Sequence, residues 1–388
     1  MLDFEHLILN IEAAIKYYAE NEIDSYNLQQ GSMKQMVTVY KLMGKDQKVK
    51  EAKIRIAESF IEEAEWKKEN YPSGNSVAAT FYEKALHAYM DIGGFKTKVE
   101  ELKNKIKEAH AAAFEKEFRM TKIPIEVDKK IIDSHRERYK GRSTLEVFHL
   151  LITDPNLIPS FEGAKKATVE HAKKYVLMHL VSQSVIRKNI RVKTYETDDD
   201  RFYFFTLQNF MLDYQFKAKF FLVNAYCALK EEHPNWVAEM IKYLKTLPLV
   251  KKNRLKLIEK GLSAFEREDY ISAIHILVFQ IEGILRDTVE GLRIAPFSYH
   301  RGEMRIKKLW DILEILQKVE GIDKDILMLV RTSLVDIGGE NLRNDLAHGI
   351  LDYDEFTGLR ALILIYILLK ITPYDIIRKE KPESDVKQ

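Results

Sequence analysis

The sequence predicts an all-α protein with two or three domains, and two observations on helix breakers and residue spacing predict the helices. Only nine prolines and sixteen glycines interrupt the 388 residues, and these are the residue types that most often end helices. Leu, Ile, Ala, Lys and Glu recur at spacings of three and four, which is the period of an amphipathic helix. The chain is 46% hydrophobic and 31% charged, which provides enough apolar surface for the cores of two or three globular domains.

The first 118 residues predict a series of helical hairpins. Gly44, Pro72 to Gly74 and Gly93 to Gly94 divide this region into segments of helical length, as expected of helix terminators. The pattern Ala-x-x-x-large-x-x-Ala begins at Ala57 and again at Ala78, and it is similar to the packing pattern of tetratricopeptide hairpins. The two copies are 21 residues apart, whereas that repeat has about 34 residues. We therefore expect helical hairpins that offer a surface to a protein partner.

Residues 119–252 predict a basic, all-helical middle region. Lys and Arg number 26 and Asp and Glu number 16 in residues 119–256, and aromatic residues such as Phe202 to Phe205 lie among them. Charge together with stacking surfaces favours binding of single-stranded nucleic acid. An alternative is that the lysines form solvated helix faces and that Phe202 to Phe205 belong to a core.

Two local patterns in the middle region bear on its structure. The apolar spacing from Phe161 to Arg191 predicts helix. Three consecutive carboxylates, Asp198 to Asp200, point in different directions and predict a solvated loop or helix start, which makes a metal site there unfavourable.

Residues 253–378 predict an antiparallel bundle of four or five helices. Its elements are a long apolar helix from Asp269 to about Val289, a loop around Gly291 to Gly302, helices from Met304 to Val319 and from Lys324 to Ile337, and a closing helix from Tyr353 to Lys370. A polar tail forms residues 379–388.

Three features predict a cytoplasmic protein that does not enter a membrane. The single cysteine, Cys227, excludes an internal disulfide framework, as in proteins of a reducing compartment. The acidic start of the chain has no basic and apolar signal pattern. The longest apolar run, Ala361 to Leu369, is far shorter than the roughly 20 residues of a membrane span.

The strongest functional signal lies in the segment Gly338 to Gly349. Arg343 and Asn344 are followed, after three residues, by His348 and Gly349. Arginine is a permanently charged phosphate ligand, and histidine is the side chain that most readily transfers protons near neutral pH. Their proximity favours chemistry on a phosphodiester.

This Arg343-Asn344-x-x-x-His348-Gly349 pattern resembles the Arg-x4-6-His signature of the HEPN superfamily, in particular a branch that carries Arg-Asn-x-x-x-His-Gly. The resemblance covers about residues 253–372. It implies an HEPN-like helical bundle with RNA as its substrate, no cofactor and no metal, and a homodimer formed through the C-terminal bundle. It also implies a role in phage defence or in a stress response.

The resemblance further implies a metal-independent endoribonuclease. The 2′-hydroxyl of RNA would attack its own phosphate and leave a 2′,3′-cyclic phosphate. His348 would act as general base or acid, Arg343 would stabilise charge on the phosphoryl oxygens, and Asn344 would orient the imidazole or the phosphate. Gly349 would have a structural role as the end of a helix.

Three polar residues of the long apolar helix are candidates for supporting this site. His275, Glu282 and Arg286 are spaced by seven and four residues, so they share nearly one face of a helix. The resemblance implies that this face is turned toward the motif. The alternative is an exposed stripe with an ordinary Glu282–Arg286 pair.

A function of another class remains open from the sequence. The chain carries no phosphate-binding P-loop, no His-Glu-x-x-His helix, no Cys-x-x-Cys pair and no Gly-x-Ser-x-Gly elbow, so these enzyme signatures are excluded. A non-catalytic helical scaffold, or a protein that binds RNA or a nucleotide without cleaving it, is the alternative to a ribonuclease.

Overall fold

The computed structural model describes residues 3–21, 24–119 and 125–375. These residues are mostly helical and include two small two-stranded sheets, which confirms the prediction of a mainly α-helical chain. The chain forms two compact units, namely Met1–Pro124 with Ile186–Val192, and Ile125–Val185 with Lys193–Gln388. The polar tail predicted at 379–388 lies outside the described residues.

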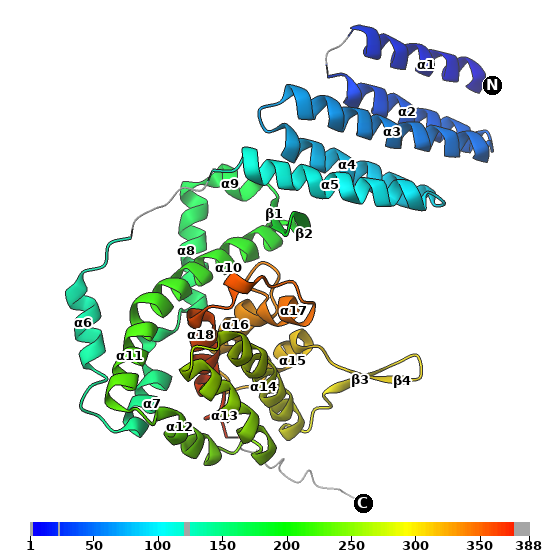
Figure 1. The fold of residues 1–388 in the computed structure, drawn as a ribbon. Coiled ribbons are helices and arrows are strands. Elements are labelled where there is room, and N and C mark those ends of the chain that lie inside the picture. The colour runs from blue at the N-terminus through cyan, green and yellow to red at the C-terminus, as the bar shows by residue number, and fades with distance from the viewer. Residues whose placement is uncertain (1–2, 22–23, 120–124, 376–388) are drawn as a thin grey trace, which may run out of the picture. The chain divides into compact units, whose positions relative to one another are not determined.

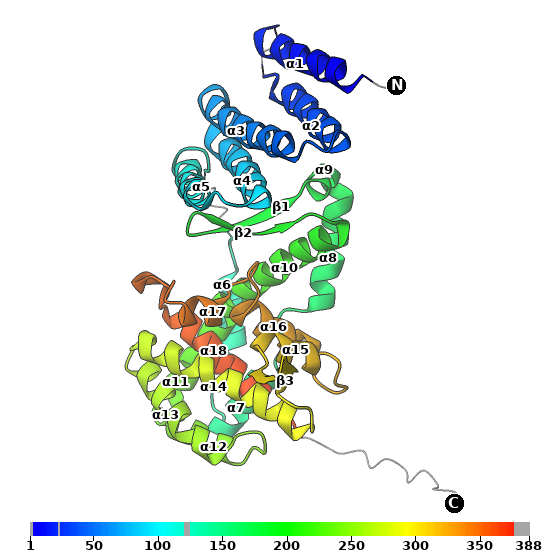
Figure 2. The ribbon, with the colours of Figure 1, turned by 90° about the vertical axis from the view of Figure 1, so that its right-hand side faces the viewer.

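The first unit contains a series of helices in which each packs against the next (Figure 2). Ala57 and Ala64 of one helix and Ala78 and Ala85 of the next belong to a single core cluster and are fully buried. Such small side chains let the two helices approach closely, which explains the repeated alanine pattern. These helices are α1 (Phe4–Asn21), α2 (Tyr26–Leu42), α3 (Asp46–Asn70), α4 (Gly74–Ile92) and α5 (Lys96–Lys116).

The second unit consists of helices around a shared core, with short 3-10 turns at Pro155–Leu157 and Tyr353–Glu355 and a π-helical turn at Ala218–Leu222. Its helices are α6 (Lys129–Glu137), α7 (Thr144–Thr153), α8 (Phe161–Lys174), α9 (Val176–Leu180), α10 (Asp198–Lys217), α11 (Val223–Glu232), α12 (Trp236–Lys245), α13 (Lys252–Glu266), α14 (Tyr270–Gly291), α15 (Leu309–Leu316), α16 (Lys324–Leu334), α17 (Leu342–Ala347) and α18 (Gly358–Ile371).

Helix α18 is the centre of the second unit. Every residue from Ala361 to Ile371 is buried, and the helix contacts α7, α13, α14 and α16 (Figure 1). A helix that is apolar on all its faces is expected where neighbours cover every side, and the one buried charged residue of α18, Lys370, donates to the Ile152 carbonyl at 2.6 Å. Among the described residues, no helix combines the length and apolarity that crossing a bilayer requires.

One hydrophobic cluster runs through the whole second unit, from Tyr139 to Ile371. Side chains from the region predicted as 119–252 and from the region predicted as 253–378 pack in it together. The predicted boundary at residue 252 therefore does not coincide with a break in the core.

Two β-hairpins form where we predicted other structure. The first, β1 (Gln183–Arg187) and β2 (Ile190–Tyr195), replaces the end of the helix predicted up to Arg191. Its turn residues Lys188 and Asn189 both have positive φ, 47° and 63°, as a two-residue hairpin turn requires.

The second hairpin, β3 (Phe297–His300) and β4 (Glu303–Ile306), occupies the end of the predicted loop and the start of the helix predicted from Met304, so that helix, α15, begins only at Leu309. Arg301 and Gly302 form its turn with φ of 50° and 88°. In both hairpins, alternating β-branched or aromatic residues flank a short turn, and this signal was present in the sequence.

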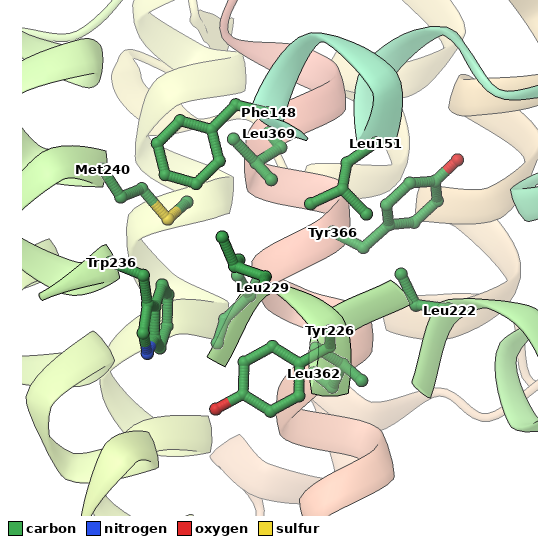
Figure 3. A pocket seen from close by; sticks show the side chains of 11 residues that line it. Phe148, Leu151, Leu222, Tyr226, Leu229, Trp236, Met240, Leu362, Tyr366 and Leu369 are labelled. Carbon is green, nitrogen blue, oxygen red and sulfur yellow. The ribbon is translucent and has the colours of Figure 1, made fainter. Parts of the chain in front are cut away.

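The second unit also contains an apolar pocket between α7, α11, α12 and α18, lined by residues that include Phe148, Trp236, Met240 and Leu369 (Figure 3). Its internal volume is about 20 Å³, which is room for about one water molecule. A space of this size without polar lining is a packing gap and does not accommodate a ligand.

The central position of α18 generates a stability prediction. Leu364→Ala removes a fully buried side chain and should lower the free energy of unfolding by about 2–5 kcal/mol, because the loss of apolar burial is combined with a cavity. Leu257→Ala, at a position that is 48% exposed, is the matched control and should change it by less than about 0.5 kcal/mol. Urea unfolding measures both, and equal effects would contradict the central role of α18.

The carboxylate of Asp154 joins α6 and α7. It is buried, and it accepts hydrogen bonds from His135 Nε2 at 2.9 Å and from Tyr139 Oη at 2.8 Å. Burial alone would raise the pKa of Asp154, but the hydrogen bonds from His135, the Asn156 backbone and Tyr139 together hold it well below its ordinary value. The folded state therefore favours the ionised form.

This lowered pKa predicts acid sensitivity. The stabilisation from the Asp154 carboxylate is complete above the unfolded-state pKa of about 4 and is lost as the pH falls toward the lower folded-state pKa. The free energy of unfolding of the wild type should therefore decrease between about pH 5 and about pH 3. Asp154→Asn should be less stable at pH 5 and should show a flatter pH dependence, and parallel curves for the two proteins would refute this role.

Candidate functional site

The Arg-Asn-x-x-x-His-Gly segment forms α17 and its C-terminal cap. Gly349 has a φ of +64°, which is the left-handed conformation that ends many helices. Its N–H donates to the Leu346 carbonyl at 3.2 Å, and the Ile350 N–H donates to the Asp345 carbonyl at 2.9 Å. This pair of bonds is a Schellman motif. Gly349 therefore ends the helix, as predicted, and places His348 at the C-cap.

Asn341 and Asn344 shape the N-terminal end of α17. Asn341 is the N-cap residue in a left-handed conformation with φ of 53°, and its side chain makes no capping hydrogen bond, contrary to the usual role of asparagine there. Instead its amide donates to Asp345 Oδ1 and accepts from Asn344 Nδ2, both at 2.7 Å. Asn344 is thus oriented within the motif by its own helix.

The carboxylate of Glu282 on α14 binds the motif arginine. Arg343 Nε donates to Glu282 Oε2 at 2.8 Å, and Arg343 Nη2 lies 3.4 Å from Glu282 Oε1. The Glu282 side chain is 11% exposed and that of Arg343 is 28% exposed. A charge-assisted, bidentate contact in this partly buried position fixes the guanidinium and aligns α17 with α14.

Arg286, one helical turn further along α14, binds the same carboxylate at 2.8 Å. Its Nη1 also donates to the Lys307 carbonyl at 2.9 Å and to the Pro296 carbonyl at 3.4 Å. These carbonyls are at the two ends of the β3–β4 hairpin. The cluster of Glu282, Arg286 and Arg343 has two positive charges and one negative charge, so it retains a formal charge of +1 that favours an anion.

His348 is exposed to solvent, and within the described residues its imidazole has no hydrogen-bonding partner. At about 100° per residue, it is rotated about 40° from Asn344 and about 140° from Arg343 around an ideal helix. The Arg343 guanidinium extends back toward Asn344, because its Nη1 lies 3.3 Å from Asn344 Oδ1. Asn344 therefore lies between the arginine and the face of the helix that carries His348.

The structure separates the three candidate supporting residues. Glu282 and Arg286 lie at Arg343, as described above. His275 instead stacks on Phe356, with ring centroids 5.4 Å apart and planes inclined by 7°, and its Nδ1 lies 2.8 Å from the Ile271 carbonyl. His275 is therefore an exposed residue of α14 whose described contacts are to Phe356, which follows the 3-10 turn Tyr353–Glu355, and to its own helix.

Many basic residues of the middle region are paired locally. Lys165 and Lys173 form ion pairs at 2.7 Å with glutamates one turn away on α8. Phe205 is buried, whereas Phe202 is 36% exposed. Residues Asp198–Asp200 lie in the first turn of α10, and Asp200 makes a capping box with Thr197. This confirms the prediction of a helix start.

We compared this chain with protein-family models, with curated proteins and with solved structures. None of the three comparisons found a match.

The contact between Glu282 and Arg343 makes a quantitative prediction. A double-mutant cycle with Glu282→Gln and Arg343→Gln should give a coupling energy of about 1–3 kcal/mol, because removing either partner leaves a partly buried charge without its counterion. Urea unfolding of the four proteins measures this energy. The exposed pair Lys242 and Glu239, whose side chains are 71% and 42% exposed, is the matched control and should show a far smaller coupling. A coupling no larger than the control would contradict the contact.

Proposed function

We propose that this chain is a metal-independent endoribonuclease of the HEPN type, with Arg343, Asn344 and His348 as catalytic residues. The observation that carries the proposal is the arrangement around α17. A cluster with a formal charge of +1 lies at one side of the short helix, and an exposed imidazole occupies its C-cap. A phosphodiester needs these two functions, a cation for its oxygens and a group that transfers protons.

Each residue has a distinct role in the proposed reaction. The 2′-hydroxyl of the RNA attacks the adjacent phosphorus, and the bond to the 5′-oxygen of the next nucleotide breaks. The products are a 2′,3′-cyclic phosphate and a free 5′-hydroxyl. His348 accepts the proton of the 2′-hydroxyl or donates one to the leaving oxygen, while Arg343 stabilises charge on the non-bridging oxygens. Asn344, which lies between them, orients the phosphate.

A homodimer is part of this proposal. One imidazole does not readily accept the nucleophile's proton and protonate the leaving group in the same step, and the described chain presents one copy of the motif. Two copies of α17 across a two-fold axis would supply both an acid and a base. The wide angle between Arg343 and His348 on one helix also favours a site completed by a second subunit. The active species should therefore have twice the 45.4 kDa mass of the chain.

One observation favours a non-catalytic function instead. The guanidinium of Arg343 is bound by Glu282, so the arginine could serve mainly to hold α17 against α14. In that case the chain would be a helical scaffold, or a protein that binds RNA or a nucleotide without cleaving it. The two functions differ in whether RNA is cut.

The test is RNA cleavage in EDTA. Purified wild type should cut mixed single-stranded RNA without added metal and leave 2′,3′-cyclic phosphate ends, detected by mass spectrometry. His348→Ala should reduce the rate by about 10²- to 10⁴-fold through the loss of proton transfer. Arg343→Ala should reduce it by about 10²- to 10³-fold through the loss of charge stabilisation.

His87→Ala is the control for this test, because His87 is an exposed histidine on α4. It should retain full activity, and circular dichroism should show that all variants remain folded. Absence of cleavage by the wild type, or cleavage that persists in His348→Ala, would contradict the nuclease proposal. Binding of RNA without cleavage would support the non-catalytic alternative.

A further inference from the structure

The β3–β4 hairpin extends away from the helices of its own unit (Figure 1), and one of its faces is apolar. Phe297 pairs with Ile306 and Tyr299 pairs with Met304 in the strand register. Directly paired residues and residues two apart on a strand share one face. All four large apolar side chains therefore lie on the same face, whereas Ser298, His300, Glu303 and Arg305 occupy the other.

This apolar face is open to solvent. Phe297 is 44% exposed, Tyr299 and Met304 are each 72% exposed, and Ile306 is 77% exposed. Exposed hydrophobic residues are ordinary when they are scattered, but a contiguous set on one element indicates a binding surface. Proteins and nucleic acids both bind to such surfaces. The charge around the apolar face therefore decides which of the two is the better occupant.

The charge of the hairpin favours a polyanion. Residues 293–308 contain five basic residues and one acidic residue, for a net charge of +4. Arg301 is at the tip of the hairpin, and Lys307 and Lys308 follow β4 at its base. A two-fold contact between two such hairpins would bring like charges together, which opposes a second copy of the chain as the occupant.

The base of the hairpin is attached to the candidate site. Arg286 donates to the carbonyls of Pro296 and Lys307, one at each end of the hairpin, and the same guanidinium binds Glu282, the partner of Arg343. A strand of RNA that lies along the hairpin would thus approach the helix that carries the motif.

We propose that the apolar face of the β3–β4 hairpin is a single-stranded RNA-binding surface. Phe297 and Tyr299 stack on bases, and the flanking Arg and Lys residues bind the backbone phosphates. The proposal rests on the proposed nuclease function only for the statement that this RNA is the strand to be cut. Binding itself is tested independently.

The experiment measures binding of a fluorescent 2′-O-methyl single-stranded RNA by anisotropy. This RNA lacks a free 2′-hydroxyl, so the measurement does not depend on cleavage. Tyr299→Ala and Tyr299→Leu should each weaken binding by roughly 5- to 100-fold, because a base stacks on an aromatic ring. Tyr299→Phe retains the ring and should bind nearly as the wild type does. Ser298→Ala on the polar face is the matched control and should leave binding unchanged.

Salt dependence tests the phosphate contacts separately. Arg301→Ala should reduce the slope of log K against log salt by about 0.7, which is the value for one lost contact to a single strand. An unchanged affinity in Tyr299→Ala would overturn the proposal. So would conversion of a dimer to a monomer by Tyr299→Ala with RNA affinity retained, because that result would assign the face to a second copy of the chain.

Failures of the two proposals give different results. If the wild type cleaves RNA and His348→Ala does not, while Tyr299→Ala binds normally, the nuclease assignment holds and the hairpin proposal fails. If Tyr299→Ala loses RNA binding but the wild type never cleaves, the hairpin binds RNA and the nuclease assignment fails.

Discussion

The carboxylate of Glu282 is the interaction on which the candidate site depends. It receives Arg343 from α17 and Arg286 from its own helix, each at 2.8 Å, and two cations compensate one anion in a position that is only 11% exposed. Without this carboxylate, two guanidinium groups would repel each other where they meet. Glu282 therefore determines where the short helix lies on α14 and where its arginine points. Through Arg286 it also connects the motif to the base of the β3–β4 hairpin.

This arrangement has a consequence for ligand binding. In the free protein the Arg343 guanidinium is bound by a carboxylate, so a phosphate must share the guanidinium with Glu282 or displace it. Arginine presents five donors, and Glu282 engages Nε and Nη2, so Nη1 remains directed toward Asn344 and the side of the helix nearer His348. A phosphate bound there would contact the arginine without loss of the ion pair. The same ion pair would then hold the guanidinium in place against the phosphate.

The sequence predicted much of the helical architecture, because helix signals are local. The spacing of apolar residues and the positions of glycine and proline located the helices of the first unit, the long helix α14 and most of α18. The predicted start of α18 is wrong by five residues, because Tyr353–Glu355 form a 3-10 turn and the helix begins at Gly358. The β1–β2 hairpin is missed because the helix predicted for residues 161–191 extends past Leu180, whereas β1 begins at Gln183. The β3–β4 hairpin is missed because its residues are divided between a predicted loop and the helix predicted to follow it. Glu282, the carboxylate that binds Arg343, is 61 residues away in the chain. A seven-and-four spacing places His275, Glu282 and Arg286 on one face of a helix, but it does not show that His275 stacks on Phe356 while Glu282 binds Arg343.

The most direct test of the central claim is a crystal structure of the protein bound to a 2′-O-methyl RNA. The account predicts one backbone phosphate within hydrogen-bonding distance, about 3 Å, of the Arg343 guanidinium and of a His348 imidazole from either subunit, with the strand continuing along the apolar face of the β3–β4 hairpin. A phosphate bound elsewhere, with Arg343 held by Glu282 alone and His348 facing solvent, would contradict it.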